Sequence, residues 1–383
     1  MGHCSAMANG RIAAKCSALP TNRGVLASKP WRRAVVQQIT LETYLTGWGT
    51  AGPDRRPLAS VLTAIAEAGR HISEVVAQGA LAGNLGRTVG RNSDGDERKG
   101  LDALAHDRLV RALGETPVAY IASEEAEEPV QVDPKAQLAV ALDPLDGSSN
   151  IDTNVPIGTI FSVLPAPGSV NGAAQSVFLQ PGSRQLAAGY VIYGPQCSLV
   201  MTVGKGTHVF TLDRASGAFR MTRAVVQVPE CAREYAINAS NYRHWTGAIR
   251  GYIDDCVAGK DGARGEDFNM RWLASLVGEC HRILTRGGVF LYPQDTRQGY
   301  EQGRLRLIYE ANPIAWLVEQ AGGLATNGRQ RILDLVPRRL HERTPLIFGS
   351  REEVARIARY TAHSYAAGER SPLFSQRGLF RGW

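Results

Sequence analysis

The most informative stretch of the sequence is Asp143-Pro144-Leu145-Asp146-Gly147-Ser148-Ser149-Asn150, which follows the apolar run 137–142. Pro144 stiffens the backbone between two carboxylates that stand three residues apart. Gly147 permits a tight turn, and Ser148 or Ser149 can begin a helix whose free N–H groups favour phosphate. Two carboxylates beside such a site would repel phosphate unless cations intervene, and these oxygen ligands suit Mg²⁺ or Mn²⁺. The string therefore predicts a site for metal and phosphate rather than a plain solvated turn.

Two further carboxylate motifs also follow expected strands. Ser123-Glu124-Glu125 follows the apolar run 117–122, and Glu310 follows the strand expected at 304–309. Strands that end in carboxylates bring them to one edge of a sheet, where α/β proteins build their sites. One of the paired acids can bridge metals while the other accepts a proton from an attacking water. A third carboxylate from Glu310 would complete a two-metal site.

The order of apolar patterns predicts an α/β protein. A helix is expected over 58–79, then a loop over 80–100 that is rich in Gly, Asn and charge, and a second helix over 104–113. Strands are expected at 159–164, 186–193, 199–203 and 207–212, and near residue 226 the pattern restarts. A helix from Asn269 to Thr285, strands at 289–292 and 304–309, a helix at 313–321 and a last helix after Ser350 follow. We expect an extension at 1–38, α/β domains at 39–225 and 226–361, and a tail at 362–383.

Composition excludes several classes of protein. The chain has 383 residues, 44% of them hydrophobic and 21% charged, which is ordinary for a globular protein of about two domains. No apolar run approaches the roughly 20 residues that cross a bilayer. The six cysteines form no C-x-x-C pair, so neither a zinc site nor a disulfide framework is expected. Residues 1–40 hold six basic residues and no acid, which indicates a targeting peptide, a disordered extension or an upstream start codon.

Together these motifs resemble class 1 fructose-1,6-bisphosphatases, and the resemblance covers residues 39–361. It rests on DPLDGSSNID at 143–152, SEE at 123–125, the acids at 96 and 102, RGGVFLYP at 286–293 and GRLRLIYEANP at 303–313. The resemblance implies a layered αβαβα sugar-phosphatase fold of two sheets with flanking helices. It implies hydrolysis of the 1-phosphate of fructose 1,6-bisphosphate to fructose 6-phosphate, in gluconeogenesis or the Calvin cycle. It also implies a cytoplasmic bacterial homotetramer, with a plastid location less expected.

The resemblance also assigns residues to roles. The ligands of two or more Mg²⁺ (or Mn²⁺) ions would be Glu124, Asp143, the Leu145 carbonyl, Asp146 and Glu310. Glu125 with Asp102 would activate water, and Asp96 would assist from the charged loop. The 1-phosphate would bind at Asp146, Gly147, Ser148 and Ser149. The sugar and the 6-phosphate would bind at Asn238, Tyr242, Arg271, Tyr292 and Arg304, with Arg271 reaching into a neighbouring subunit.

The chain departs from animal and enteric relatives at several positions. Arg304 stands in place of a lysine, and Trp272 in place of a tyrosine beside the 6-phosphate. Arginine keeps the charge but presents it as a planar fork. These changes resemble the enzymes of carbon-fixing bacteria, some of which also accept sedoheptulose 1,7-bisphosphate. Gln137-Leu138 replace the family's Lys-Tyr pair for AMP, and residues 151–185 contain no cysteine, so neither strong AMP inhibition nor a thioredoxin switch of the plastid kind is expected.

Two other functions stay open at this point. An inositol-monophosphatase-like enzyme shares the D-P-x-D-G core, although that family usually has threonine after the glycine and a W-D acid where this chain has Tyr309-Glu310. A non-catalytic polyanion-binding protein is suggested by the tail, which alternates basic and aromatic residues between Arg370 and Trp383. The tail can equally pack on a neighbouring subunit. A complete carboxylate set has no purpose in polyanion binding, so nucleic acid is not an expected partner.

Overall fold

A computed structural model describes residues 39–91, 97–166 and 174–367 of the chain. The expectations for the basic extension 1–38, for Asp96 and for the tail beyond residue 367 lie outside these ranges. The helix α7, Arg351–Ala367, continues six residues past the expected start of the tail. No helix within the described ranges combines the length and the apolarity that a membrane span requires.

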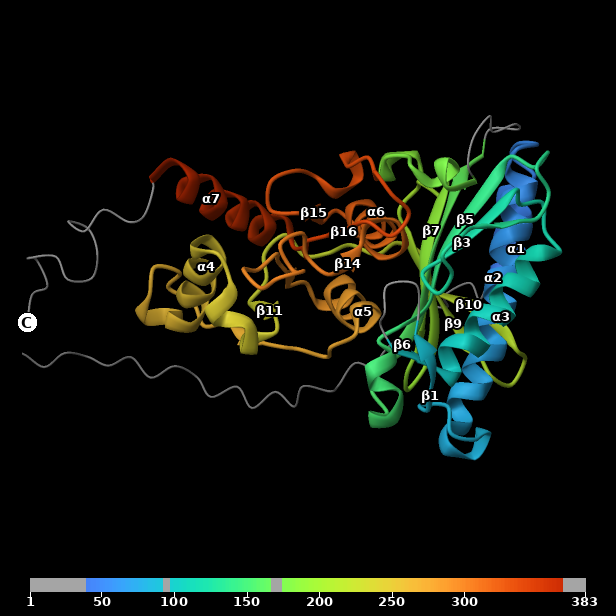
Figure 1. The fold of residues 1–383 in the computed structure, drawn as a ribbon, viewed down its shortest axis with the longest axis horizontal. Helices are drawn as coiled ribbons and strands as arrows, with labels where there is room; N and C mark the ends of the chain where they lie inside the picture. Colours follow the sequence, from blue (N-terminus) through green and yellow to red (C-terminus); the bar gives the residue numbers. More distant parts are fainter. Residues whose placement is uncertain (1–38, 92–96, 167–173, 368–383) are drawn as a thin grey trace, which may run out of the picture. The chain divides into compact units, whose positions relative to one another are not determined.

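An eight-stranded sheet forms the first half of the fold (Figure 1), in the order β10-β9-β8-β7-β6-β5-β3-β4. All neighbouring strands are antiparallel except β3 and β5, which are parallel. The strands are β3 (Tyr120–Ser123), β4 (Val130–Gln131), β5 (Leu138–Asp146), β6 (Ile157–Pro165), β7 (Ala187–Tyr193), β8 (Cys197–Thr202), β9 (Thr207–Asp213) and β10 (Ala218–Arg223). The central strands are buried along their length because both faces of the sheet are covered.

Three helices cover one face of this sheet. They are α1 (Leu41–Gly49), α2 (Arg55–Gln78) and α3 (Gly100–Gly114), whose apolar side chains share one core with the strands. The helix predicted at 58–79 is confirmed and begins three residues earlier. The loop predicted at 80–100 is wrong in part, because it contains a short helix η1 (Gly79–Ala82) and the antiparallel strands β1 (Thr88–Arg91) and β2 (Glu97–Lys99).

A five-stranded sheet in the order β12-β11-β13-β17-β15 forms the second half. Its strands are β11 (Glu234–Ala236), β12 (Asn269–Met270), β13 (Val289–Tyr292), β15 (Leu324–Thr326) and β17 (Leu346–Gly349). Helices α5 (Leu276–Arg286) and α6 (Asn312–Gln320) pack in a core with residues of both sheets, such as Tyr190 and Phe348. Helices α4 (Gly247–Ala258) and α7 pack on the other face of the small sheet. The layers run αβαβα, which confirms the predicted fold class (Figure 1).

Short helical turns and one small ribbon connect these layers. The turns are η2 (Ser148–Thr153), η3 (Ala174–Phe178), η4 (Gly182–Arg184), η5 (Ala239–His244), η6 (Gly259–Asp261), a single turn of π-helix η7 (Leu307–Ala311) and η8 (Ile332–Asp334). The ribbon pairs β14 (Leu305–Arg306) with β16 (Arg343–Thr344) in antiparallel fashion.

Two predicted elements differ from the structure. The helix expected from Asn269 begins at Leu276, because residues 269–270 pair with β11 and Ala274 takes a left-handed conformation with φ +55°. The strand expected at 304–309 is two residues long and turns into η7, which leads directly into α6. Residues 307–311 are all buried, and a short buried segment of this length is compatible with either a strand or a helical turn.

Candidate active site

Three carboxylates from two elements meet in the interior of the molecule. Asp143 and Asp146 lie at the end of β5, and Glu310 lies on η7. All three residues are buried, and one carboxylate oxygen from each lies within 4.8 Å of the others. In a regular strand, residues three apart point to opposite faces. Here the pairing of β5 with β6 shifts register between Asp143 and Asp146, and this irregularity lets both side chains meet Glu310.

The backbone around the irregularity is held by hydrogen bonds. The Leu145 N–H donates to Asp143 Oδ1 at 3.0 Å, and the Thr159 hydroxyl donates to the Pro144 carbonyl at 2.8 Å. Asp146 Oδ2 accepts from the Val277 N–H at 2.8 Å and from the Ser275 hydroxyl at 3.2 Å. The start of α5 therefore anchors one member of the carboxylate cluster.

The electrostatics of this cluster favour cations. Burial raises the pKa of Asp143 well above its usual range, and the charges of Glu124, Glu310 and Asp146 raise it further. Burial and the charge of Glu124 likewise raise the pKa of Glu310. Burial raises the pKa of Asp146 to about 6, against its hydrogen bonds from the start of α5. Several buried acids can be ionised together only beside positive charge, and their oxygens are the ligands of hard divalent cations. The residues therefore fit the expected magnesium.

Arg306 links Glu124, the fourth acid among the predicted metal ligands, to the cluster. Its Nε lies 3.6 Å from Glu124 Oε1, and its own N–H donates to Glu310 Oε2 at 2.5 Å. The side chain is 2% exposed, which is unusual for arginine. Sequence reasoning missed Arg306, although it lies inside the motif GRLRLIYE and a buried arginine needs acidic partners.

The two acids predicted to activate water have separate partners in the structure. Asp102, in the first turn of α3, is buried and accepts the Lys99 N–H at 2.7 Å. Burial raises the pKa of Asp102, while the hydrogen bond from the Lys99 N–H lowers it. Glu125 forms an ion pair with Arg98 of β2, at 3.1 Å between Oε2 and Nε. This ion pair was not predicted from the sequence, because Arg98 lies in the segment read as a loop.

The predicted phosphate turn follows the two aspartates directly. Gly147 has φ +81°, and a Cβ at this position would lie 3.2 Å from the Ser275 Cβ. Ser148, whose hydroxyl donates to the Leu145 carbonyl at 3.2 Å, and the exposed Ser149 begin η2. The segment is a 3₁₀ turn rather than the α-helix start that the sequence suggested. Asn150 fixes it to the second half of the fold by donating to the carbonyls of Leu273 and Ala274.

Some of the predicted sugar-site residues come together. Asn238 and Tyr292 line one small cleft with Asn241 and Trp245. Burial raises the pKa of Tyr292, and the nearby charge of Arg304 opposes this shift. The guanidinium of Arg304 stacks on the Tyr300 ring, 4.8 Å from its centroid, and donates to the Tyr300 hydroxyl at 3.0 Å.

Three of the predicted residues, Tyr242, Arg271 and Arg304, do not line that cleft. Tyr242 is 41% exposed and donates its hydroxyl to Asp254 on α4 at 2.7 Å. Arg271 follows the edge strand β12, and its exposed guanidinium lies 4.0 Å from Glu234. Trp272, the next residue, stacks on Phe290 with 6.0 Å between ring centroids.

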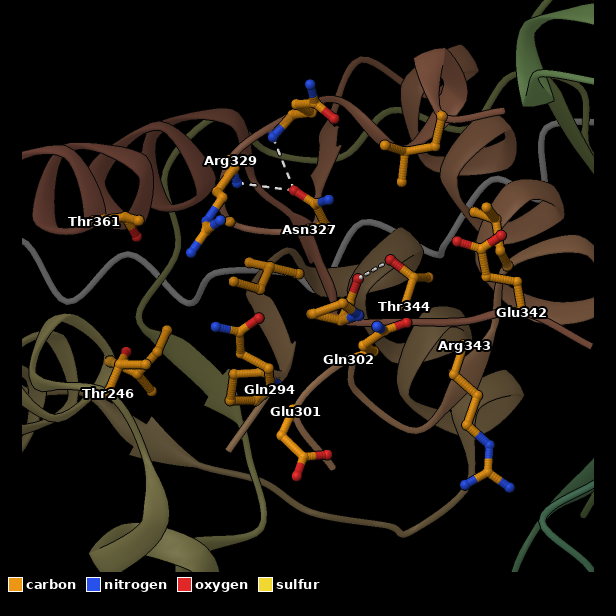
Figure 2. A pocket seen from close by; sticks show the side chains of 18 of the residues that line it. Thr246, Gln294, Glu301, Gln302, Asn327, Arg329, Glu342, Arg343, Thr344 and Thr361 are labelled. Carbon is orange, nitrogen blue, oxygen red and sulfur yellow. Dashed lines mark hydrogen bonds between the residues drawn. The ribbon is translucent and has the colours of Figure 1, made fainter. Parts of the chain in front are cut away.

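A cavity of about 580 Å³ lies elsewhere in the second half of the fold. Figure 2 shows its polar lining, which includes Gln302, Asn327, Arg329 and Thr344. None of the predicted site residues lines it. The carboxylate cluster, rather than the size of a cavity, therefore locates the chemistry.

A layered αβαβα fold, with a buried set of oxygen ligands beside a glycine turn, defines a metal-dependent sugar phosphatase. Comparison with known proteins narrows this class. The model of the fructose-1-6-bisphosphatase N-terminal domain matches residues 37–224, and that of the C-terminal domain matches residues 228–362. The chain belongs to the class 1 fructose-1,6-bisphosphatase family. Its activity is that of a fructose-1,6-bisphosphatase, a phosphoric monoester hydrolase of carbohydrate metabolism, and its family uses a divalent metal.

Similar proteins cover nearly the whole described chain. The class 1 fructose-1,6-bisphosphatase of Rhizobium meliloti (strain 1021) is 57% identical over 344 residues, which are 89% of this chain and 99% of that protein. The class 1 enzyme of Paracoccus denitrificans (strain Pd 1222) is 54% identical over 87% of this chain and 98% of its own length. The crystal structure of Leishmania major fructose-1,6-bisphosphatase in holo form superimposes with a TM-score of 0.79 at 34% identity, covering 85% of this chain and 99% of that chain.

Proposed function

We propose that water attacks the 1-phosphate of fructose 1,6-bisphosphate directly at the carboxylate cluster, with no covalent enzyme intermediate. The observation that carries this proposal is the meeting of Asp143, Asp146 and Glu310 within 4.8 Å in the interior. Glu124, which Arg306 links to this group, and the Leu145 carbonyl complete the proposed ligand set for two or more Mg²⁺ or Mn²⁺ ions. When bound, such cations offset the charge of the phosphoryl group and make the attacking water more acidic.

The other residues supply proton transfer and orientation. Glu125 accepts the proton of the water once its carboxylate leaves Arg98, and Asp102 supports it from α3. Asp96 assists from the segment before β2. The backbone of Gly147, Ser148 and Ser149 holds the 1-phosphate, because a turn of this kind directs N–H groups to one point.

Asn238, Tyr292 and Arg304 hold the sugar and the 6-phosphate, which is not the reacting group, so their contribution is orientation. Tyr242 reaches this site only if its hydroxyl leaves Asp254. Arg271 reaches the 6-phosphate of a neighbouring subunit in a homotetramer. Its exposed guanidinium beside the edge strand β12 supports this arrangement.

The proposal predicts a large loss of activity from single changes in the cluster. Asp146→Ala removes a metal ligand, and Glu125→Gln removes the proton acceptor, so each should lower kcat by orders of magnitude, about 10²-fold or more. Circular dichroism should show an intact fold in both variants. Turnover of fructose 1,6-bisphosphate with Mg²⁺ is the measurement, and near-normal activity in either folded variant would refute the assignment.

A second substrate is proposed because of the departures at the sugar site. Arg304, where relatives have a lysine, stacks on Tyr300, and Trp272, where they have a tyrosine, stacks on Phe290, so both departures change the aromatic surroundings of Tyr292. We therefore expect sedoheptulose 1,7-bisphosphate to be hydrolysed with kcat/KM within about 200-fold of the six-carbon substrate, since one added carbon unit changes binding by about 1–3 kcal/mol. Kinetics on both bisphosphates, with Mg²⁺ and with Mn²⁺, measures this ratio. A difference above 10³-fold would exclude the second substrate.

The place of the enzyme in the cell is proposed on the same basis. Dual use of these substrates would fit the Calvin cycle as well as gluconeogenesis, in the cytoplasm of a bacterium.

The proposed domains are 39–225, which carries the metal and phosphate motifs, and 226–361, which carries the sugar site. Turnover of inositol 1-phosphate at a rate similar to that of the bisphosphate would favour the inositol-monophosphatase-like alternative.

A further inference from the structure

The turn between β12 and α5 contacts the phosphate string at two points. The carbonyls of Leu273 and Ala274 accept from Asn150 Nδ2 at 3.1 and 3.0 Å. The Val277 N–H and the Ser275 hydroxyl both donate to Asp146 Oδ2. A displacement of this turn would therefore move Asp146 and η2 together.

The same turn also forms part of the wall near the proposed sugar site. Trp272 stacks on Phe290 with the two ring planes 7° apart, and its ring centroid lies 6.1 Å from that of Tyr292. Leu273 is the next residue along the chain. Residues 272–277 thus connect a ring beside Tyr292 directly to the donors that hold Asp146.

Glu279 holds this turn from inside the protein. It lies in the first turn of α5, its side chain is fully buried, and Oε1 accepts the Leu273 N–H at 2.5 Å. Ala274, one residue further, has a φ of +55°, which costs a residue with a Cβ about 1–2 kcal/mol and persists only where neighbouring contacts enforce it. The hydrogen bond from Leu273 to Glu279 is such a contact.

The second oxygen of the Glu279 carboxylate, Oε2, is less well satisfied than the first. Oε2 is buried and has no hydrogen-bond partner among the residues that the structure describes. The guanidinium of Arg282, three residues along α5, donates to Glu234 at 2.6 Å instead. An unpaired buried carboxylate is costly for stability, so an acceptor that reaches Leu273 serves something other than packing.

We propose that Glu279 is a positioning residue, which fixes the spacing between the phosphate turn and the sugar site so that one bisphosphate spans both. This inference rests on the proposed roles of Asp146 and Tyr292. A substrate with a single phosphate has no second phosphate that must reach a second binding site. Its turnover therefore depends less on this spacing than the turnover of a bisphosphate does.

The test compares two substrates on the full-length enzyme with saturating Mg²⁺. Steady-state kinetics are measured with fructose 1,6-bisphosphate and with fructose 1-phosphate. Glu279→Leu removes the acceptor and should lower kcat/KM about tenfold or more for the bisphosphate, but only about two- to threefold for the monophosphate. Glu279→Gln keeps an acceptor of the same length and should stay within about threefold of wild type on both.

Two further variants keep the test decisive. Glu353→Gln alters a buried carboxylate on α7 that pairs with Arg264, so it should lower thermal stability without changing the ratio between the substrates. If Glu279→Leu fails to fold, Glu279→Asp takes its place, because its carboxylate is one methylene too short to reach Leu273. Equal losses on both substrates, or a Glu279→Gln variant as impaired as Glu279→Leu, would overturn the proposal. A wild-type enzyme that uses both substrates equally well would instead refute the proposed two-phosphate site, and the inference would fall with it.

Discussion

Gly147 is the residue where backbone conformation and chemistry depend on each other most directly. Its φ of +81° is accessible to glycine without strain, and an added Cβ would press against the Ser275 Cβ at 3.2 Å. We expect Gly147→Ala to lower kcat at least about tenfold, because about 1–2 kcal/mol of strain shifts the N–H groups of the phosphate turn and the hydroxyl that holds Asp146. Turnover of fructose 1,6-bisphosphate is the measurement.

A second glycine with a similar φ serves as the control, because it distinguishes backbone strain from a direct effect on the reaction. Gly206 has nearly the same φ, +83°, but a Cβ there meets no atom within 4 Å. Gly206→Ala should therefore impose a similar backbone strain without the steric contact, so it should lower the melting temperature by no more than Gly147→Ala does while kcat stays near wild type. Equal kcat in both variants would show that the Gly147 backbone does not hold the substrate.

At the level of single residues, sequence patterns identify the acidic residues of the site better than they identify the residues that contact those acids. Asp143, Asp146 and Glu310 were selected because each follows an expected strand, and their carboxylates lie together in the structure. The ion pair of Arg98 with Glu125 and the contacts of Arg306 join segments far apart in sequence. Such pairs depend on the tertiary arrangement, and no local pattern encodes them. Tyr242 and Asn241 differ by one position, and only the backbone of η5 decides which of them faces the cleft.

Among the elements, α5 carries a titratable group whose effect on stability can be measured. Burial raises the pKa of Glu279 to about 7, from a usual value of 4.5, with the charge of Arg282 opposing the shift. As pH rises above about 4.5, the unfolded chain releases this proton first, so the folded state loses stability until about pH 7. We expect the Glu279→Gln variant, which cannot ionise, to gain about 2–3 kcal/mol in free energy of unfolding relative to wild type between pH 5 and pH 8. Denaturant titrations at these two pH values measure the difference, and a constant difference would show that the carboxyl ionises normally.

The elements that sequence reasoning predicted best are those with one clear periodicity. The helix α2 has buried residues at helical spacing, and strands β5 to β9 are apolar runs of strand length. The segment 304–309 was misread because residues 304–308 alternate in the manner of a strand, while residues 307–311 are all buried and their sequence does not separate a strand from a turn of π-helix. The start of α5 was misplaced because the conformation of Ala274 depends on contacts that no helical periodicity shows. Its carbonyl accepts from Asn150, which is far away in the sequence, and the preceding N–H, of Leu273, donates to Glu279.

At the scale of the whole molecule, the layered fold joins the two halves of the site. Asp146 belongs to the large sheet, and its hydrogen-bond donors belong to α5, between the two sheets. The αβαβα order came from the family resemblance, because alternating elements alone predict α/β without saying how many sheets form. The site therefore needs both halves of the chain, although its most recognisable string lies in only one of them.

The replacement of the family's Lys-Tyr pair by Gln137 and Leu138 predicts an enzyme that AMP does not control. Leu138 begins β5 and is only 5% exposed, with its side chain in the core beneath α1, α2 and α3. It offers a nucleotide no hydrogen bond, and the neutral amide of Gln137 cannot replace an ammonium group beside a phosphate. A hydrogen bond to a charged group is worth about 1.5–3 kcal/mol, so losing two such donors should weaken AMP binding by at least about 100-fold.

Activity at saturating fructose 1,6-bisphosphate should accordingly stay within about 20% of its starting value at millimolar AMP, since 100-fold weaker binding leaves the site largely empty. A parallel titration with inorganic phosphate serves as the control, because it reports competition at the active site rather than binding beneath the helices. Strong cooperative inhibition by AMP, at concentrations where phosphate has no effect, would contradict the prediction. It would mean that other groups on α1 and α2 bind the nucleotide without the pair that precedes β5.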